Sequence, residues 1–230
     1  MSDNLISAQP GHAVTSSFAM VRALGLIATV CGLIIVASYQ STLGVVAENK
    51  RISLERAVFK VIPGAASVRE FVATTAGIQP AGETVPQGAV KFYAAYDKAG
   101  AFKGLAAEAA AKGYADEVRV LYAYDPARQA ITSIGVVSMH ETPGIGDKIL
   151  TDQAFQKNFA ALDVQLTADM KAVANAVRVV KHGTKRNAWE IDAISGSTVT
   201  SKAVGKGIRD STAKLLPLLV PHVEQLKARS

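Results

Sequence analysis

The chain is poor in metal-binding side chains: its 230 residues include a single cysteine, Cys31, and four histidines. One cysteine excludes an internal disulfide framework, a cysteine-rich metal site and a cysteine-ligated iron–sulfur cluster. The histidines, at positions 12, 140, 182 and 222, show no metal-ligand spacing. The sequence therefore predicts no metal site.

Aromatic residues are also scarce, at 6% of the chain, and no run of Lys or Arg accounts for its formal net charge of +6. A nucleic-acid surface needs a basic stripe or patch, so basic residues scattered along the sequence argue against a nucleic-acid partner. Hydrophobic residues make up 49%, which argues against a disordered protein. The length suits one ordinary domain with a small appendage.

Charge is entirely missing from Ala23 to Ala47. About 20 helical residues, rising about 1.5 Å each, cross a hydrocarbon core about 30 Å thick. We therefore predict a tail over 1–22 and a single transmembrane anchor over 23–47. A cleaved signal peptide is the alternative, but its apolar region is shorter and this stretch has no clear Ala-x-Ala site.

The charges that flank this span leave its orientation open. Arg22 precedes the span, whereas Lys50, Arg51 and Arg56 follow it. The positive-inside rule alone would thus place the main domain in the cytoplasm, although the rule is weak for large domains.

The rest of the sequence indicates an α+β fold in which helices pack on an antiparallel sheet. Apolar spacing predicts a juxtamembrane helix that ends at Pro63-Gly64, so that 48–88 comprises this helix plus a linker, with a loop over 74–88. The main domain is expected over 89–216, followed by a C-terminal extension over 217–230 whose last part, 223–230, is expected to be frayed and amphipathic. Strands are predicted at 90–96, 118–124, 131–138 and 189–194, and helices at 152–162, 198–216 and part of 168–180; residues 102–111 suit a helix or a strand.

The most informative stretch runs from Asp192 to Val204, where a strand leads into a turn rich in hydroxyl groups. Gly196 permits backbone angles that a Cβ disfavours. Ser195, Ser197 and Thr198 are residue types that cap helix starts, and such an end attracts anions, phosphate above all. Two interpretations remain open: an ordinary helix cap, or a phosphate-bearing cofactor held at the turn or bonded to one of its hydroxyls.

A second loop, Glu141-Thr142-Pro143-Gly144-Ile145-Gly146, follows the 131–138 strand. Its proline and glycines predict a compact turn. Taken alone, this loop would be only a well-made turn with a solvated carboxylate at Glu141.

The two stretches together resemble one family. Ser195-Gly196-Ser197-Thr198, followed by Val-Thr-Ser, resembles the flavinylation motif of FMN-binding subunits of the RnfG and NqrC types. The 141–146 loop resembles the Glu-Thr-Pro-Gly-Leu-Gly loop of that family, and the Gly-Asp-Lys continuation is closer to the Rnf branch. Gly113-Tyr114 also stands where the family has Gly-Tyr, although the second glycine usual there is replaced, with Asp116 nearby.

The resemblance implies a covalent cofactor, FMN, attached by a phosphoester to Thr198. Ser195, Gly196 and Ser197 are then expected to hold the phosphate end. Glu141, Thr142, Gly144 and Ile145 are expected beside the ring, with Thr142 as a hydrogen-bonding candidate. A threonine hydroxyl is a poor nucleophile without an adjacent base. We therefore expect another enzyme to perform the attachment, and no catalytic residue in this chain. The resemblance implies that this enzyme is a magnesium-dependent flavin transferase that uses FAD.

The implied function is electron transfer within an Rnf-type ion-translocating oxidoreductase, between ferredoxin and NAD pools. The chain would act as a non-autonomous subunit in the bacterial inner membrane, with its tail inside and its main domain periplasmic. Its partners would be the lipid bilayer and other subunits of the complex. The alternatives are an NqrC-type or stand-alone covalent FMN carrier, and a non-redox, membrane-tethered binding domain whose turn only caps a helix.

Overall fold

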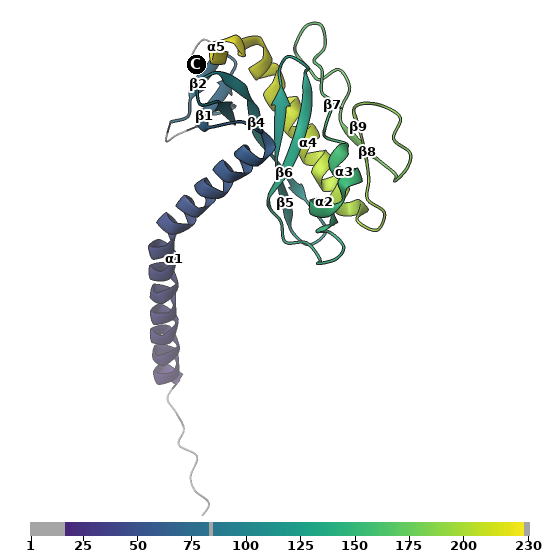
Figure 1. Ribbon diagram of the computed structural model, residues 1–230. Coiled ribbons are helices and arrows are strands. Elements are labelled where there is room, and N and C mark those ends of the chain that lie inside the picture. The colour runs from purple at the N-terminus through teal and green to yellow at the C-terminus, as the bar shows by residue number, and fades with distance from the viewer. Residues whose placement is uncertain (1–16, 83–84, 228–230) are drawn as a thin grey trace, which may run out of the picture. The chain divides into compact units, whose positions relative to one another are not determined.

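The computed structural model describes residues 17–82 and 85–227 (Figure 1). Residues 1–16 of the expected tail and 228–230 of the expected extension lie outside the described residues. The chain divides into two compact units, Met1–Lys50 and Arg51–Ser230. The described part of the first unit is entirely helical, and the second unit contains the sheet.

Helix α1 spans Ser17–Val61, so the charge-free stretch is helical throughout, as predicted. It is long and apolar enough to cross a membrane. The juxtamembrane segment is the end of this same helix rather than a separate one, because no glycine or proline interrupts the hydrogen bonding between Ala47 and Val61. The helix ends just before Pro63-Gly64, as expected.

The second unit is built on a seven-stranded antiparallel sheet, which confirms the predicted α+β class. The strand order is β2-β1-β3-β4-β5-β6-β7, and two further strands, β8 and β9, pair in parallel. The strands are β1 (Ser67–Thr74), β2 (Gly77–Pro80), β3 (Val90–Tyr96), β4 (Phe102–Lys112), β5 (Glu117–Asp125), β6 (Ala130–Ser138), β7 (Leu162–Asp163), β8 (Arg178–Val180) and β9 (Glu190–Asp192). The helices that follow the sheet are α2 (Lys148–Thr151), α3 (Gln153–Lys157), α4 (Thr198–Leu219), the 3₁₀ turn η1 (Val220–His222) and α5 (Glu224–Lys227).

The sheet begins earlier than the sequence indicated. Strand β1 pairs with β3 from Ser67 to Ala73, and β2 lies within 74–88, where a loop was predicted. The sheet therefore starts at Ser67 rather than near Ala89. The ambiguous stretch 102–111 is strand β4, whose alanines belong to both buried faces of the sheet.

The helices predicted between β6 and β9 are largely absent from the described structure. The helix expected over 152–162 is limited to α3, which begins as expected with the Asp152 carboxylate accepting a hydrogen bond of 2.8 Å from the Phe155 amide. No helix forms over 168–180. Met170 there has a φ of +56°, a left-handed conformation that a right-handed helix cannot contain.

Both faces of the sheet are covered within the second unit. Helix α4 packs on one face, where Val204, Ile208 and Leu215 join the main core, and Figure 1 shows it lying against the strands. The last turns of α1 cover the other face through Leu54, Val58 and Val61. The two-sided burial makes the sheet a rigid support for the loops at its ends.

The C-terminal segment is packed rather than frayed, so that prediction was wrong. Helix α4 continues to Leu219 with Pro217 inside its last turn, and Leu226 in α5 is fully buried. The Gln225 side chain accepts a hydrogen bond of 3.4 Å from the Ile78 amide in β2. The tail thus packs against β2, the edge strand of the sheet.

We expect Leu226→Ala to lower the free energy of unfolding by about 2–5 kcal/mol, because it leaves a cavity in the core. Leu150→Ala is the control, since Leu150 is half exposed and its loss should cost no more than about 0.5 kcal/mol. Urea unfolding of the full chain in detergent measures both values. Equal values for the two variants would contradict the packed tail.

Candidate functional site

The turn between β9 and α4 adopts the backbone geometry that its sequence predicted. Gly196 has a φ of +80°, in the left-handed region that favours glycine. Ser197 occupies the N-cap position of α4, but its side chain makes no capping hydrogen bond. Ser201 fastens the turn instead: its hydroxyl accepts from the Ile194 amide at 3.1 Å and donates to the Ser197 carbonyl at 2.9 Å.

Strand β9 is held at the start of this turn by a buried carboxylate. Glu190 accepts hydrogen bonds from the backbone amides of Arg186 (2.7 Å) and Asn187 (3.0 Å), and also pairs with the Arg178 guanidinium. The amide of Arg186 first, and then the Arg178 guanidinium, lower the pKa of Glu190 to about 2. These bonds fix the 181–187 loop to β9.

Thr198 is exposed at the first position of α4. Its hydroxyl makes one hydrogen bond in the described part of the chain, to the Ile194 carbonyl at 3.5 Å. The nearest acid in the sequence, Asp192, instead accepts from the Gly183 amide at 2.8 and 3.0 Å. Within residues 17–82 and 85–227, therefore, no basic side chain is bonded to the Thr198 hydroxyl to activate it.

The 141–146 loop is compact, as predicted. Gly144 has a φ of +76°, and the amides of Ile145 and Gly146 both donate to the Thr142 carbonyl, at 3.2 and 2.9 Å. The loop therefore presents the side chains of Thr142 and Ile145 from a fixed backbone.

Glu141 joins this loop to two other segments and is not a solvated turn carboxylate. One of its oxygens accepts from the Thr200 hydroxyl at 2.8 Å, and the other accepts from the Ala115 amide at 3.1 Å and the Asp116 amide at 3.5 Å. Gly146 makes room for it, since a Cβ there would lie 2.5 Å from the Glu141 Cβ. One carboxylate thus connects the loop, the β4–β5 turn and the start of α4.

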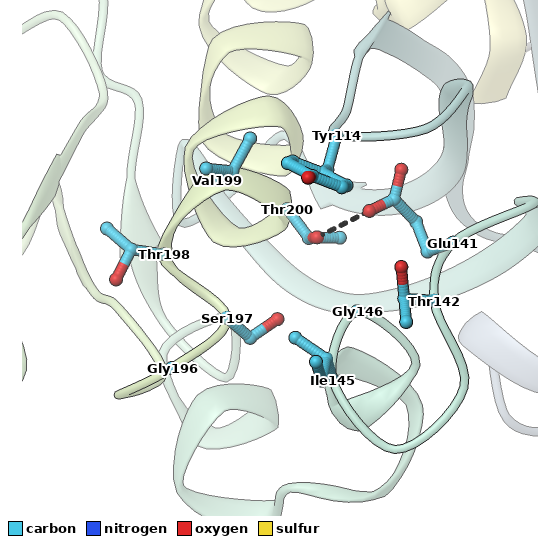
Figure 2. Close-up of a pocket in the computed structure, with 10 residues that line it drawn as sticks. All are labelled: Tyr114, Glu141, Thr142, Ile145, Gly146, Gly196, Ser197, Thr198, Val199 and Thr200. Atoms are coloured by element: carbon cyan, nitrogen blue, oxygen red, sulfur yellow. Dashed lines mark hydrogen bonds between the residues drawn. The ribbon is translucent and has the colours of Figure 1, made fainter.

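These three segments enclose a cavity of about 460 Å³, which Figure 2 shows with its lining residues. Six of the eight predicted site residues line this cavity, whereas Ser195 and Gly144 do not. The lining is Tyr114, Glu141, Thr142, Ile145, Gly146, Gly196, Ser197, Thr198, Val199 and Thr200.

Four lining residues were not assigned to the site from the sequence: Tyr114, Gly146, Val199 and Thr200. The Gly113-Tyr114 pair carried a signal, since it matched the family pattern, but the sequence did not place it beside the other two motifs. Thr200 enters the site through its bond to Glu141, 59 residues away, and no local pattern reveals such a contact.

The cavity has the features of a site for an amphipathic cofactor. Three large apolar side chains that line it are exposed, Tyr114 by 73% and Ile145 and Val199 by 50% each. Such gathered apolar surface marks a ligand site, and the volume lies in the range of about 300–1,000 Å³ that ligand pockets occupy.

A buried polar atom also faces this cavity. Ser197 is 2% exposed, and its hydroxyl has no hydrogen-bond partner in the described structure, although buried polar groups normally have one. Figure 2 shows this hydroxyl directed to the side on which Ile145 lies. An apolar wall with an unpaired hydroxyl and a helix N-terminus suits a flat ring that carries a phosphate.

Comparison with known proteins gives a consistent result. Residues 113–213 match the FMN-binding domain family, and this range contains all three segments of the cavity. The chain is 30% identical over 200 residues to the G subunit of the proton-translocating ferredoxin:NAD(+) oxidoreductase complex of Clostridium ljungdahlii, covering 87% of this chain and 92% of that protein. It is also 30% identical to the G subunit of the ion-translocating oxidoreductase complex of Cereibacter sphaeroides, covering 79% of this chain and 76% of that protein.

Solved structures support the same fold. The crystal structure of NqrC from Shewanella oneidensis superposes with a TM-score of 0.59 at 20% identity, over 79% of this chain and 99% of that one. At this identity the likeness concerns the fold alone.

Proposed function

We propose, because the chain belongs to the family of G subunits of ion-translocating ferredoxin:NAD⁺ oxidoreductase complexes, that it is an FMN-carrying electron-transfer component of such a complex. The observation that carries the proposal is the cavity formed by Tyr114, the 141–146 loop and the 196–200 turn. The chain would act with other subunits of that complex, between ferredoxin and NAD pools.

The residues present fit FMN. Thr198 would carry the phosphate through a phosphoester, at the N-terminus of α4, where the helix dipole and free amides favour an anion. Ser195 and Gly196 shape the turn beside it. Tyr114, Ile145 and Val199 supply the apolar wall for the ring, and Thr142 and Ser197 supply hydroxyls at its edge.

When bound, FMN supplies the electron-accepting and electron-donating chemistry. The chain's own contribution is to position it. Glu141 keeps the three walls of the cavity together, Gly144 sets the turn that presents Thr142 and Ile145, and the buried Ser197 hydroxyl offers a hydrogen bond that nothing else in the described structure takes up.

We further propose that the link to FMN is covalent and is made by a flavin transferase with FAD as the donor. The Thr198 hydroxyl has no bonded base in the described residues, so a second enzyme must activate it. The test is a denaturing gel of the full chain co-expressed with the transferase. A yellow, fluorescent band is expected; a colourless band would contradict the covalent link.

The apolar part of α1 is proposed to anchor the chain in the inner membrane, with the main domain in the periplasm. We expect the full chain to remain in membranes after carbonate washing. A Lys98→Cys variant in a Cys31→Ser background should react with an impermeant thiol reagent added from the periplasmic side, since Lys98 is exposed. Release by carbonate would contradict the anchor, and labelling from the cytoplasmic side alone would contradict the orientation.

The 141–146 loop is proposed to set the reduction potential of the flavin rather than to attach the flavin to the chain. Thr142→Ala removes a hydroxyl whose hydrogen bond would be worth about 0.5–1.5 kcal/mol, and Ile145→Ala removes half-exposed apolar surface at the ring. We expect both variants to keep normal flavin occupancy and to shift the reduction potential. Redox titration of each purified variant measures this. An unchanged potential and flavin spectrum in both would mean that the loop is only a turn.

A further inference from the structure

Basic residues that are scattered in the sequence come together on the outer face of α4. Lys202, Lys206 and Arg209 follow Thr198 by four, eight and eleven residues, a spacing that places all four on one face of a helix. All four are exposed. We call Lys202, Lys206 and Arg209 the basic stripe; it begins one helical turn from the proposed flavin-bearing hydroxyl.

The stripe keeps a net positive charge. Asp210 pairs with Lys206 at 3.3 Å and with Arg209 at 3.0 Å, so one carboxylate is shared by two cations. Lys202 has no carboxylate within ion-pair distance among the described residues. Three cations and one anion leave a charge of about +2 along about two helical turns.

The stripe also borders a hollow. A depression of about 280 Å³ lies between α4 and β8, lined by the three stripe residues together with Arg178, Gly205 and neighbouring valines. Arg178 is paired with Glu190. The hollow lies outside the flavin cavity and shares no lining residue with it.

A second basic segment lies beside strand β9, which leads into the flavin turn. The 181–187 loop carries Lys181, Lys185 and Arg186 and is bonded to the strand that enters the flavin turn. The Gly183 amide donates to Asp192, and the His182 ring lies 3.0 Å from the Ala193 carbonyl oxygen. Basic residues therefore lie beside the strand that enters the flavin turn as well as along the helix that leaves it.

We propose that the basic stripe is the docking surface for the flavin transferase, with the anionic, FAD-loaded cleft of that enzyme seated on it. The inference rests on the proposed attachment at Thr198. Figure 2 shows the Thr198 side chain directed away from Glu141, Thr142 and Tyr114, so an enzyme that acts on its hydroxyl approaches from outside the cavity. The FAD diphosphate and the carboxylates around its Mg²⁺ would together carry more negative charge than the ion neutralises, and a cleft of that charge would complement the stripe.

This assignment is more specific than a general surface for redox partners. The exposed side chains of the apolar wall, Tyr114 and Ile145, lie on the other side of the first turn of α4 from the Thr198 side chain (Figure 2). A protein that exchanges electrons with a ring held there needs to reach that wall. The enzyme that makes the bond needs to reach Thr198.

The reaction served by this docking balances without a further reagent. The Thr198 oxygen forms a bond to the FAD phosphorus that carries riboflavin, and the P–O–P bond of FAD breaks. AMP leaves, and the hydroxyl proton passes to a base of the transferase. Positive charge beside Thr198 also favours the leaving phosphate.

The test is the rate of covalent flavin incorporation into the full chain, purified in detergent from cells that lack the transferase. Purified transferase, FAD and Mg²⁺ are added, and initial rates are measured against the concentration of the chain at low and high salt. The test variant reverses the stripe: Lys202→Glu, Lys206→Glu and Arg209→Glu. The matched control reverses three exposed lysines elsewhere in the second unit: Lys60→Glu, Lys98→Glu and Lys103→Glu.

We expect the stripe variant to lose about tenfold or more in kcat/KM at low salt, mainly through KM, and the loss to shrink at high salt. The control should stay within about twofold of the wild type. Lys202→Gln, which keeps a helix-forming residue, should give a smaller loss in the same direction if the triple variant proves unstable. Both triple variants should still carry their flavin on Thr198 after long incubation.

A stripe variant with the same kcat/KM and salt dependence as the control would overturn the docking assignment. So would normal flavin incorporation combined with slowed electron transfer, because the stripe would then serve a redox partner. Either result leaves the attachment site intact. Failure of the wild-type chain to accept flavin at Thr198 would instead contradict the proposed function itself.

Discussion

Thr198→Ala should abolish covalent FMN while leaving the fold intact. The substitution removes the oxygen proposed to form the phosphoester, and the hydroxyl makes only one long hydrogen bond, 3.5 Å to the Ile194 carbonyl, among the described residues. Loss of that one hydrogen bond costs about 0.5–1.5 kcal/mol, too little to unfold the domain. In-gel flavin fluorescence after denaturation measures attachment, and circular dichroism during heating measures the fold.

Thr200→Val is the matched control for this prediction. Thr200 is the next threonine in the helix, but it is 2% exposed and its hydroxyl is bonded to Glu141. The Thr200 variant should keep its flavin on Thr198, although the environment of the ring is expected to change. Covalent flavin on the Thr198→Ala protein would contradict the assignment.

Gly146→Ala is expected to disturb the cavity strongly. The added Cβ would lie 2.5 Å from the Glu141 Cβ and 2.9 Å from one of its carboxylate oxygens, so Glu141 must move. We expect the free energy of unfolding to fall by about 1–3 kcal/mol, as for other overpacked sites. The bonds from Glu141 to Thr200 and to the β4–β5 turn should weaken, which would alter the absorbance and fluorescence of bound flavin.

Gly82→Ala serves as its control, because nothing lies within 4 Å of a Cβ at that position. This variant should match the wild type within about 0.5 kcal/mol and keep the flavin spectrum. Urea unfolding and flavin absorbance, measured on both full-length variants, compare them directly. If Gly146→Ala had the same stability and flavin spectrum as Gly82→Ala, the claim that Glu141 holds the three segments of the cavity together would be contradicted.

Local chemistry predicted the parts of the fold in which one physical effect dominates. The charge-free stretch predicted a long apolar helix, which is α1, and the alternating residues over 118–124 predicted the strand that the structure contains as β5. Gly196 and Gly144 both adopt the positive φ that their turns suggested. Both motifs thus predicted turns that the structure contains.

Long-range contacts decided the remainder. Strand β4 is rich in alanine, which favours helix locally, but pairing with β3 and β5 on both sides overrides that preference. The C-terminal tail lacks a strong pattern, and its order comes from Leu226, which is buried in a core built by distant strands. Likewise, no periodicity could reveal that Glu141 bonds to Thr200 or that Tyr114 shares their cavity.

The central claim, a phosphoester between FMN and Thr198, is tested most directly by mass spectrometry of the tryptic peptide that spans residues 187–202. Cleavage after Arg186 and Lys202 releases one peptide with every hydroxyl of the turn. For the full chain co-expressed with the transferase, we predict this peptide with the added mass of one FMN less one water, and fragment ions that place the addition on Thr198. An unmodified peptide, or an addition on Thr200 or on a serine of the turn, would contradict the account.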